Sequence, residues 1–208
     1  MQGKFIVFEG IDGSGKTTQL QLLAEKFKTQ QISVVTTKEP TDGPIGSLAR
    51  NVLNRRLVLD EKTLATLYLA DRLDHIQNPV NGMLHDLQKG KTILCDRYYL
   101  SSYAYHSSHV PLQWVINANS ECAKLMRPDI IFFLDVQPDV SLKRLQQSRD
   151  FLDLFETQER LEQVRANYFT AIERVKAAEN IVVLDATQSQ VQLANQIWTI
   201  VQQLNHSI

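Results

Sequence analysis

The chain has 208 residues, of which 43% are hydrophobic and 22% charged, and this composition fits one globular domain better than two. The net charge of −1 with no basic tract argues against a nucleic-acid polymer as partner, and no apolar run approaches the roughly 18 residues of a membrane span. The two cysteines, Cys95 and Cys122, are too few for a disulfide framework, so we expect buried thiols in a cytoplasmic protein.

Five short apolar runs predict strands, at residues 4–8, 32–37, 92–95, 130–134 and 181–184. Helical patterns lie between and after them, at about 16–30, 45–54, 60–88 with an interruption near Pro79, 99–107, 111–126, 138–147, 157–178 and 189–204. Strands that alternate with helices favour a parallel sheet with helices on both faces. We therefore expect an α/β fold of three layers, with a five-stranded parallel sheet, as a single domain over residues 1–208.

The first predicted strand leads into a phosphate-binding motif. Residues 10–17 read Gly-Ile-Asp-Gly-Ser-Gly-Lys-Thr and fit G-x-x-x-x-G-K-[ST] between a strand and a helix. The glycines allow successive backbone N–H groups to converge on phosphate oxygens, whereas the alternative is a glycine-rich turn that only caps the helix. Lys16 adds a charge near the β- and γ-phosphates, and the Thr17 hydroxyl is the expected protein ligand of Mg²⁺. The residues expected to bind the nucleoside triphosphate are Gly10, Ile11, Asp12, Gly13, Ser14, Gly15, Lys16, Thr17 and Thr18.

A carboxylate and a guanidinium follow the predicted strand at 92–95. Ligands of open α/β sheets bind beyond the carboxyl ends of the strands, which gives weight to Asp96 and Arg97. A carboxylate there can hold Mg²⁺ through its water shell, and a guanidinium can bridge two phosphoryl groups. The alternative is a helix cap with a surface ion pair. Asp135 follows the strand at 130–134 in the same way, and the sequence does not fully separate the two carboxylates.

Two further patterns are typical of a pocket for a nucleotide acceptor. Tyr68, Arg72 and His75 recur at helical spacing, so a ring that stacks on a base and a guanidinium that grips it could share one face. The alternative for the first two is a solvated cation–π pair. Residues 98–109 hold many hydroxyls and rings directly after Arg97, as expected of a pocket wall for a sugar and a base.

The charged segment after the predicted helix at 138–147 is typical of a lid. It covers about residues 147–157 and lies between two helical patterns. There it could deliver an arginine onto bound phosphates and exclude water. Arg149 is the best-placed cation of this segment.

Together these motifs resemble the thymidylate kinase family of P-loop nucleoside monophosphate kinases, which phosphorylate dTMP with ATP. Residues 8–19 are similar to the family's phosphate loop, and 68–72 to the segment whose aromatic ring stacks on thymine and whose arginine contacts the base. Residues 96–105 resemble its D-R-Y-x-x-S-x-x-A-Y signature. The other similar segments are 38–40, with lysine at the first position of R-E-P, 46–50 and 165–168. The match covers nearly the whole chain.

The resemblance implies the three-layer P-loop NTPase fold and transfer of the γ-phosphoryl group of Mg·ATP to dTMP, in a homodimer formed through long helices. It implies catalytic roles for Asp12, Lys16, Arg97 and Arg149, a nucleotide contact by Arg144, and Mg²⁺ at Thr17 and, through water, at Asp96. The residues that it implies for dTMP are Glu39, Pro40, Arg50, Tyr68, Arg72, Arg97, Ser101, Ser102 and Tyr105. The Tyr105 ring would lie near the 2′ position and crowd out a ribose hydroxyl.

The chain departs from the family pattern at three places. His106 stands where many bacterial members carry glutamine, and Leu154 stands where the D-R-F-E element of the lid has its arginine. The phosphate loop carries Gly13 and Ser14 and has no arginine of its own. The arginines left to bridge the phosphates are Arg97, Arg144 and Arg149.

Other functions remain open at this point. A kinase for another nucleoside monophosphate would share these motifs, and a deoxynucleoside kinase could use Glu39 as its base. A nucleotide-switched binding protein is disfavoured, because the chain has no N-K-x-D motif and lacks a D-x-x-G after the strand at 92–95. A non-catalytic relative is a further alternative.

Overall fold

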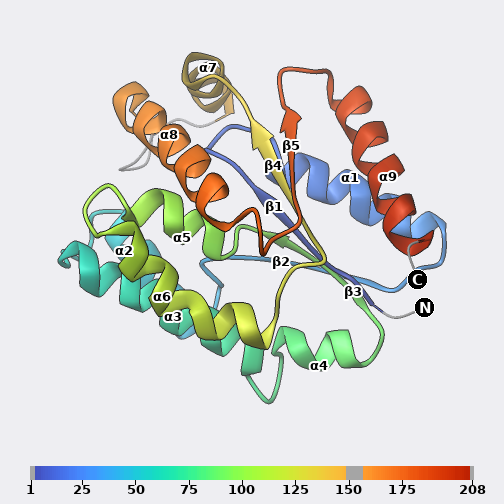
Figure 1. Ribbon diagram of the computed structural model, residues 1–208, viewed down its shortest axis with the longest axis horizontal. Helices are drawn as coiled ribbons and strands as arrows, with labels where there is room; N and C mark the ends of the chain where they lie inside the picture. Colours follow the sequence, from blue (N-terminus) through green and yellow to red (C-terminus); the bar gives the residue numbers. More distant parts are fainter. Residues whose placement is uncertain (1–2, 149–156, 207–208) are drawn as a thin grey trace.

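The computed structural model describes residues 3–148 and 157–206 of the chain (Figure 1). Within these residues the centre is a sheet of five strands, β1 (Phe5–Glu9), β2 (Val34–Lys38), β3 (Thr92–Asp96), β4 (Ile130–Asp135) and β5 (Ile181–Asp185). The strands lie in the order β2-β3-β1-β4-β5, and each neighbouring pair is parallel. The predicted five-stranded parallel sheet is confirmed, and the carboxyl ends of these strands share one edge.

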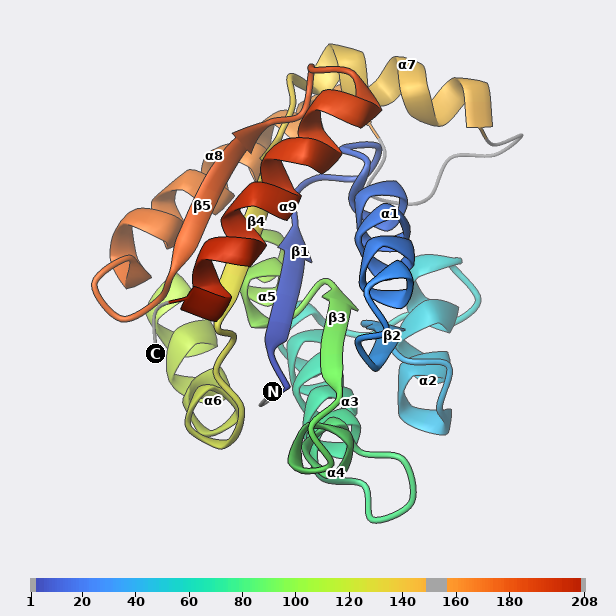
Figure 2. The same cartoon turned by 90° about the vertical axis from the view of Figure 1, so that its right-hand side faces the viewer.

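Helices cover both faces of the sheet. α1 (Lys16–Thr29) and α9 (Gln190–His206) lie on the face that is turned toward the viewer in Figure 2. The opposite face carries α3 (Glu61–Gln77), α5 (Tyr99–His106), α6 (Leu112–Leu125) and α8 (Gln158–Val175). The shorter helices pack at the margins, with α2 (Pro44–Leu53) and α4 (Met83–Gln88) on α3 and α7 (Pro138–Ser148) on α8. These are the three layers that the sequence predicts.

The central strands are apolar on both sides because helices cover both faces of the sheet. The side chains of residues 5–8 in β1 and 130–134 in β4 are at most 1% exposed. The edge strand β2 is less buried, with Thr36 and Lys38 exposed and Val34, Val35 and Thr37 partly buried. Cys95 and Cys122 are buried free thiols, as expected.

The predicted helical stretch over 60–88 forms two helices, with the expected interruption at Pro79. Proline has no N–H and disfavours the helical conformation of the residue before it, so α3 ends before Asn78. At the other end, the Asp60 carboxylate accepts hydrogen bonds from the backbone N–H groups of Lys62 at 3.0 Å and Thr63 at 3.1 Å. Other boundaries differ from the predictions by a few residues, as at β2, which begins two residues late, and α9, which extends to 206.

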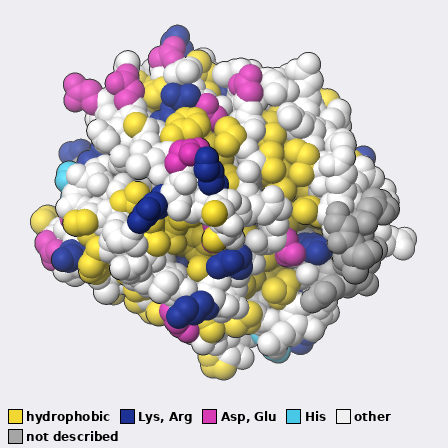
Figure 3. Space-filling model, in the orientation of Figure 1, with side chains coloured by type: hydrophobic (Ala, Val, Ile, Leu, Met, Phe, Trp, Pro, Cys, Tyr) yellow, Lys and Arg dark blue, Asp and Glu magenta, His cyan; other side chains and the backbone are white. Residues whose placement is uncertain are grey.

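The described surface carries charges of both signs. On the face in Figure 3, basic and acidic side chains are interspersed among hydrophobic ones over the described residues.

No helix in the described part of the chain is both long and apolar enough to cross a membrane. The grooves that hold the predicted site residues lie at the carboxyl edge of the sheet.

Candidate active site

The phosphate loop connects β1 to α1 at the carboxyl edge of the sheet. Gly13 and Gly15 have φ angles of 75° and 93°, which most other residues rarely adopt, and a Cβ on Gly13 would lie 2.7 Å from the backbone oxygen of Ser141. Gly15 is the N-cap of α1, so the positive end of this helix faces the groove beside the loop. Residues 12–18 line that groove, whereas Gly10 and Ile11, which were also predicted for the triphosphate, are not among its lining residues.

Lys16 and Thr17 lie in the first turn of α1. The Lys16 Nζ donates to the Ile11 carbonyl at 3.0 Å, and burial, followed by the charge of Arg97, lowers the pKa of this lysine to about 8. Thr17 Oγ1 donates to Asp96 Oδ2 at 2.5 Å, across 79 positions of sequence. The two residues predicted to hold Mg²⁺ are therefore neighbours, and a hydroxyl and a carboxylate are oxygen ligands of the kind this ion takes.

The two strand-end carboxylates that the sequence left unseparated have different partners. Asp135 accepts a bidentate pair of hydrogen bonds from Arg165, at 2.7 Å from Nε and 2.9 Å from Nη2. Asp96, by contrast, meets the Thr17 hydroxyl of the phosphate loop. The structure thus separates a carboxylate held in an ion pair from one that faces the triphosphate groove.

Arg144 crosses the triphosphate groove from α7. Its Nη2 donates to the carbonyl of Ala186 at 2.9 Å, so the side chain reaches the loop after β5. Arg144 lines the groove together with Ala186, Gln188, Gln190 and Leu193, which come from that loop and from α9. A nucleotide contact by Arg144 stays a prediction, and the side chain is placed in the groove where such a contact could form.

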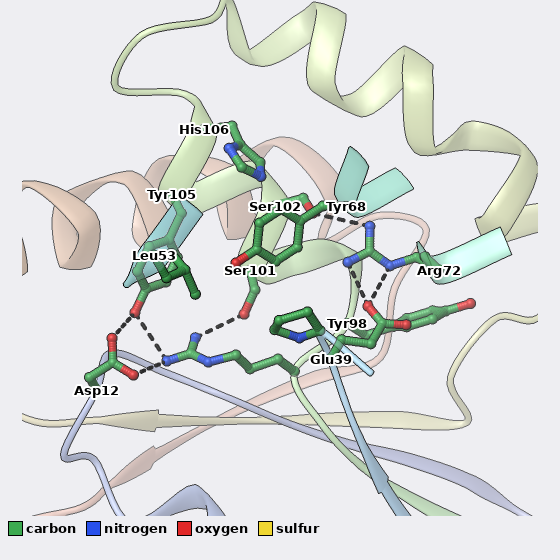
Figure 4. Close-up of a pocket in the computed structure, with 12 residues that line it drawn as sticks. Asp12, Glu39, Leu53, Tyr68, Arg72, Tyr98, Ser101, Ser102, Tyr105 and His106 are labelled. Atoms are coloured by element: carbon green, nitrogen blue, oxygen red, sulfur yellow. Dashed lines mark hydrogen bonds and ion pairs between the residues drawn. The ribbon is translucent and has the colours of Figure 1, made fainter. Parts of the chain in front are cut away.

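A second pocket opens beside the phosphate loop, between α3, α5 and the loop after β2 (Figure 4). Most residues predicted for dTMP line it, namely Glu39, Pro40, Tyr68, Arg72, Arg97, Ser101, Ser102 and Tyr105. The lining also includes Asp12, Leu53, Tyr98 and His106.

Arg50, which was predicted for dTMP, does not line this pocket. Its Nη1 donates to the Pro40 carbonyl at 3.1 Å and its Nη2 to Ser47 Oγ at 2.9 Å, so it braces the loop that carries Pro40.

Arg97 lies where the pocket and the groove meet, and it lines both together with Asp12 and Glu39. Its Nη2 donates to Asp12 Oδ1 at 2.6 Å and to the Tyr105 hydroxyl at 3.0 Å. Its Nη1 donates to Ser101 Oγ at 3.0 Å and to the Gly10 carbonyl at 3.1 Å. The guanidinium is therefore held at once by the phosphate loop and by α5.

Asp12 and Tyr105 form the charged corner of the pocket. The Tyr105 hydroxyl donates to Asp12 Oδ2 at 2.8 Å, an interaction drawn in Figure 4. Burial raises the pKa of Asp12, but the charges of Arg97 and Lys16 lower it by more, so this pKa lies well below its usual range. Asp12 is consequently an ionised partner for Arg97 at neutral pH.

Arg72 forms the opposite end of the pocket, where its side chain is 1% exposed. Its guanidinium contacts Glu39 Oε2 through Nε at 2.8 Å and Nη2 at 2.7 Å, and donates to Ser102 Oγ at 3.0 Å. His75 Nδ1 lies 3.0 Å from the other Glu39 oxygen. The Arg72 Cζ lies 5.3 Å from the centroid of the Tyr98 ring. Arg72 therefore belongs to a buried ion pair with Glu39 and is not the solvated cation–π partner of Tyr68.

The sequence that forms these two grooves is similar over most of its length to that of a known protein family. A family model described as thymidylate kinase matches residues 8–197. The chain belongs to the thymidylate kinase family. It is 39% identical to a probable thymidylate kinase of Pyrococcus horikoshii, over 83% of this chain and 84% of that protein. It is also similar to a probable thymidylate kinase of Thermococcus kodakarensis, at 34% over 96% of this chain and 98% of that one, and to a thymidylate kinase of Ligilactobacillus salivarius, at 37% over 91% and 92%.

His106 is the pocket residue at which this chain departs from many bacterial thymidylate kinases. Its ring is 4% exposed and packs edge-on against Tyr68, with centroids 5.1 Å apart. Burial, followed by the charge of Arg72, lowers the pKa of this histidine to about 3. The pocket wall behind Tyr68 is therefore a neutral imidazole at physiological pH.

Three lining residues, Leu53, Tyr98 and His106, were not singled out individually from the sequence. Leu53 gave no signal because an apolar residue at the end of a helix usually belongs to the core. Tyr98 and His106 fall within the predicted wall at 98–109, but nothing in that run says which side chains face the pocket. The predicted lid residue Arg149 and most of the lid lie outside the described residues.

The neutral state of His106 predicts a pH-dependent stability. Imidazole has a pKa of 6.5 in an unfolded chain and about 3 here, so the unfolded state binds the proton first as pH falls. As pH falls from about 6.5 to 3, the free energy of unfolding therefore decreases. Between pH 7 and pH 5 it decreases by about 2 kcal/mol. Urea unfolding at these two pH values should show a loss smaller by about that amount in His106→Gln. Equal losses of unfolding free energy in the wild type and in His106→Gln would contradict the lowered pKa of His106.

Proposed function

We propose that this thymidylate kinase family member transfers the γ-phosphoryl group of ATP to dTMP, giving dTDP and ADP. The observation that carries the proposal is that the triphosphate groove and the acceptor pocket meet at Arg97 and Asp12, which line both. A donor phosphate on the loop and an acceptor phosphate at the mouth of the pocket would then face each other across one guanidinium. That is the alignment a direct transfer needs.

The transfer needs no strong general base. A phosphate oxygen of the acceptor is already a nucleophile at neutral pH; it forms a bond to the γ-phosphorus while the bond to the β-bridging oxygen breaks and ADP leaves. Lys16 lies beside the phosphate loop and Arg97 between donor and acceptor, so the two cations would neutralise the charge that spreads over the transferred group. Arg149 is the further cation that we propose from the lid, with Arg144 as the alternative.

Thr17 and Asp96 are the residues proposed to hold Mg²⁺, Thr17 directly and Asp96 through water. The Thr17 hydroxyl and the Asp96 carboxylate lie 2.5 Å apart at the mouth of the triphosphate groove, which fits an ion that takes a few protein oxygens and keeps its waters. When bound, the ion neutralises phosphate oxygens and orients them. The two side chains hold each other in place for that contact.

The acceptor is proposed to lie with its base on Tyr68 and its phosphate toward Arg97. Arg72 and Ser102 offer hydrogen bonds at the base end, and Ser101 and Tyr105 lie near the sugar and phosphate. Tyr105 is tied to Asp12 and cannot swing away freely, so its ring would crowd a ribose 2′-hydroxyl. The pocket is therefore proposed to favour a deoxynucleotide.

Product analysis with a panel of acceptors tests this function. Incubation with Mg·ATP and dTMP, dUMP, thymidine, CMP, UMP or AMP is expected to give ADP fastest with dTMP. Phosphorylation of thymidine alone would instead identify a deoxynucleoside kinase, although both oxygens of Glu39, its conceivable base, are bound by Arg72 and His75. Tight ATP binding without any product would identify a non-catalytic relative.

Replacement of Arg97 by alanine tests its role in the transfer. Loss of a cation that acts in the transition state should lower kcat by roughly 100-fold or more. The control is Arg174→Ala, which removes an exposed arginine of α8 that donates to Gln113, away from both grooves. Activity of Arg97→Ala within threefold of the wild type would remove Arg97 from the mechanism.

We also propose a homodimer formed through the long helices. The outer side of α2 and α3 carries an apolar groove lined by Leu48, Leu57, Leu67 and Trp114, with Leu48 47% exposed. Light scattering should then give about twice the 23.8 kDa mass of one chain, and Leu48→Lys should shift it toward one chain. A single-chain mass at all concentrations would contradict the dimer.

A further inference from the structure

The buried carboxylate of Glu9 has no part in the mechanism proposed above. Glu9 is the last residue of β1, directly before the phosphate loop, and its side chain is fully buried. A carboxylate taken out of water is costly unless hydrogen bonds and charges compensate it. Its partners therefore indicate what it does.

One oxygen of Glu9 caps α5. Oε1 accepts from the backbone N–H of Tyr98 at 2.9 Å and of Ser101 at 3.0 Å. Tyr98 is the N-cap residue of α5, but its own side chain makes no capping hydrogen bond. The Glu9 carboxylate, from the end of β1, accepts the hydrogen bonds that a capping side chain would accept. The cap fixes the start of the helix two residues after Arg97, whose φ of 72° is unusual for a residue with a side chain.

The other oxygen of Glu9 holds two hydroxyls that contact Arg97. Oε2 accepts from Ser101 Oγ at 2.5 Å and from the Tyr168 hydroxyl at 2.9 Å. The same two hydroxyl oxygens accept from Arg97 Nη1, at 3.0 Å and 3.2 Å. The two hydroxyl oxygens also lie 2.8 Å from each other, so the carboxylate, both hydroxyls and the guanidinium form one connected hydrogen-bond network.

The pKa of Glu9 is raised overall, because the effect of burial exceeds that of its compensating partners. Burial raises the pKa of Glu9, while the hydrogen bond from Ser101 and the charge of Arg97 oppose that effect. Tyr168 comes from α8 and packs its ring on Phe133 of β4 at 4.9 Å, so the second hydroxyl is fixed by a separate part of the fold. The carboxylate thus joins β1, α5 and α8 at one point behind Arg97.

We propose that Glu9 is a positioning residue for phosphoryl transfer, because its buried carboxylate orients Ser101 Oγ and the Tyr168 hydroxyl and thereby fixes the Arg97 guanidinium between the two grooves. This inference rests on the proposed function, in which Arg97 carries charge in the transfer. A purely structural role for Glu9, as a cap of α5, is the alternative that an experiment must separate from it.

A double-mutant cycle of Glu9→Gln and Arg97→Ala separates the two roles. The amide keeps the shape of Glu9 but offers one acceptor oxygen in place of two, so the Arg97 guanidinium loses its fixed position. We expect kcat with ATP and dTMP to fall roughly tenfold, since a small displacement of a catalytic group is costly, and calorimetric ATP affinity to stay within about twofold. In the Arg97→Ala background the same change should alter kcat by less than about twofold.

Asp129→Asn is the matched control. This carboxylate accepts from the backbone N–H of Phe5 at 2.7 Å, at the opposite end of β1, so its loss should lower the unfolding temperature and leave kcat unchanged. If Glu9→Gln does not fold, Tyr168→Phe replaces it in the cycle, since it removes one of the two hydroxyls and keeps the ring.

The outcomes are distinguishable. Equal effects of Glu9→Gln in both backgrounds, or an unchanged kcat with Arg97 present, would overturn the positioning role and leave the proposed function standing. Full activity of Arg97→Ala alone would overturn the role of Arg97 and the role of Glu9 with it.

Discussion

The hydrogen bonds that hold the Arg97 guanidinium connect the two halves of the active site. Asp12, from the loop after β1, and Ser101, from the helix after β3, both contact it, at 2.6 Å and 3.0 Å. β1 and β3 are parallel neighbours, so their carboxyl ends are adjacent and short turns are enough to bring these residues together. A shift of either strand end would separate the donor groove from the acceptor pocket.

The buried sheet restricts where polar chemistry can be placed. Helices cover both faces of β1 and β4, so a charged side chain in the middle of these strands would be left without water. The carboxylates of Glu9, Asp96 and Asp135 accordingly occupy the last positions of their strands, where hydroxyls, backbone N–H groups and arginines from the following loops and helices satisfy them. The carboxyl edge of the sheet therefore carries both the buried carboxylates of these strands and the candidate active site.

The sheet and the triphosphate groove could be predicted from the sequence, because apolar runs and the phosphate loop are local patterns. The proximity of Asp96 and Thr17 followed from topology, since parallel strands present their ends at one edge. The turn of Arg50 back onto its own loop, the cap that Glu9 supplies to α5 and the contact of His106 with the aromatic ring of α3 could not be predicted. Each depends on how helices from distant parts of the chain pack, which periodicity does not encode.

The buried pairing of Arg72 with Glu39 makes the two ends of the acceptor pocket electrically unlike. Both side chains are at most 2% exposed, and their charges cancel within hydrogen-bonding distance, so the base end attracts a ligand by directed hydrogen bonds and little net field. The phosphate end also holds an arginine–carboxylate pair, Arg97 with Asp12, but these side chains are 16% and 27% exposed and the charge of Lys16 is added to theirs, so this end attracts by charge and is open to counterions. Ionic strength should therefore weaken the hold on the phosphate of a nucleotide far more than the hold on its base.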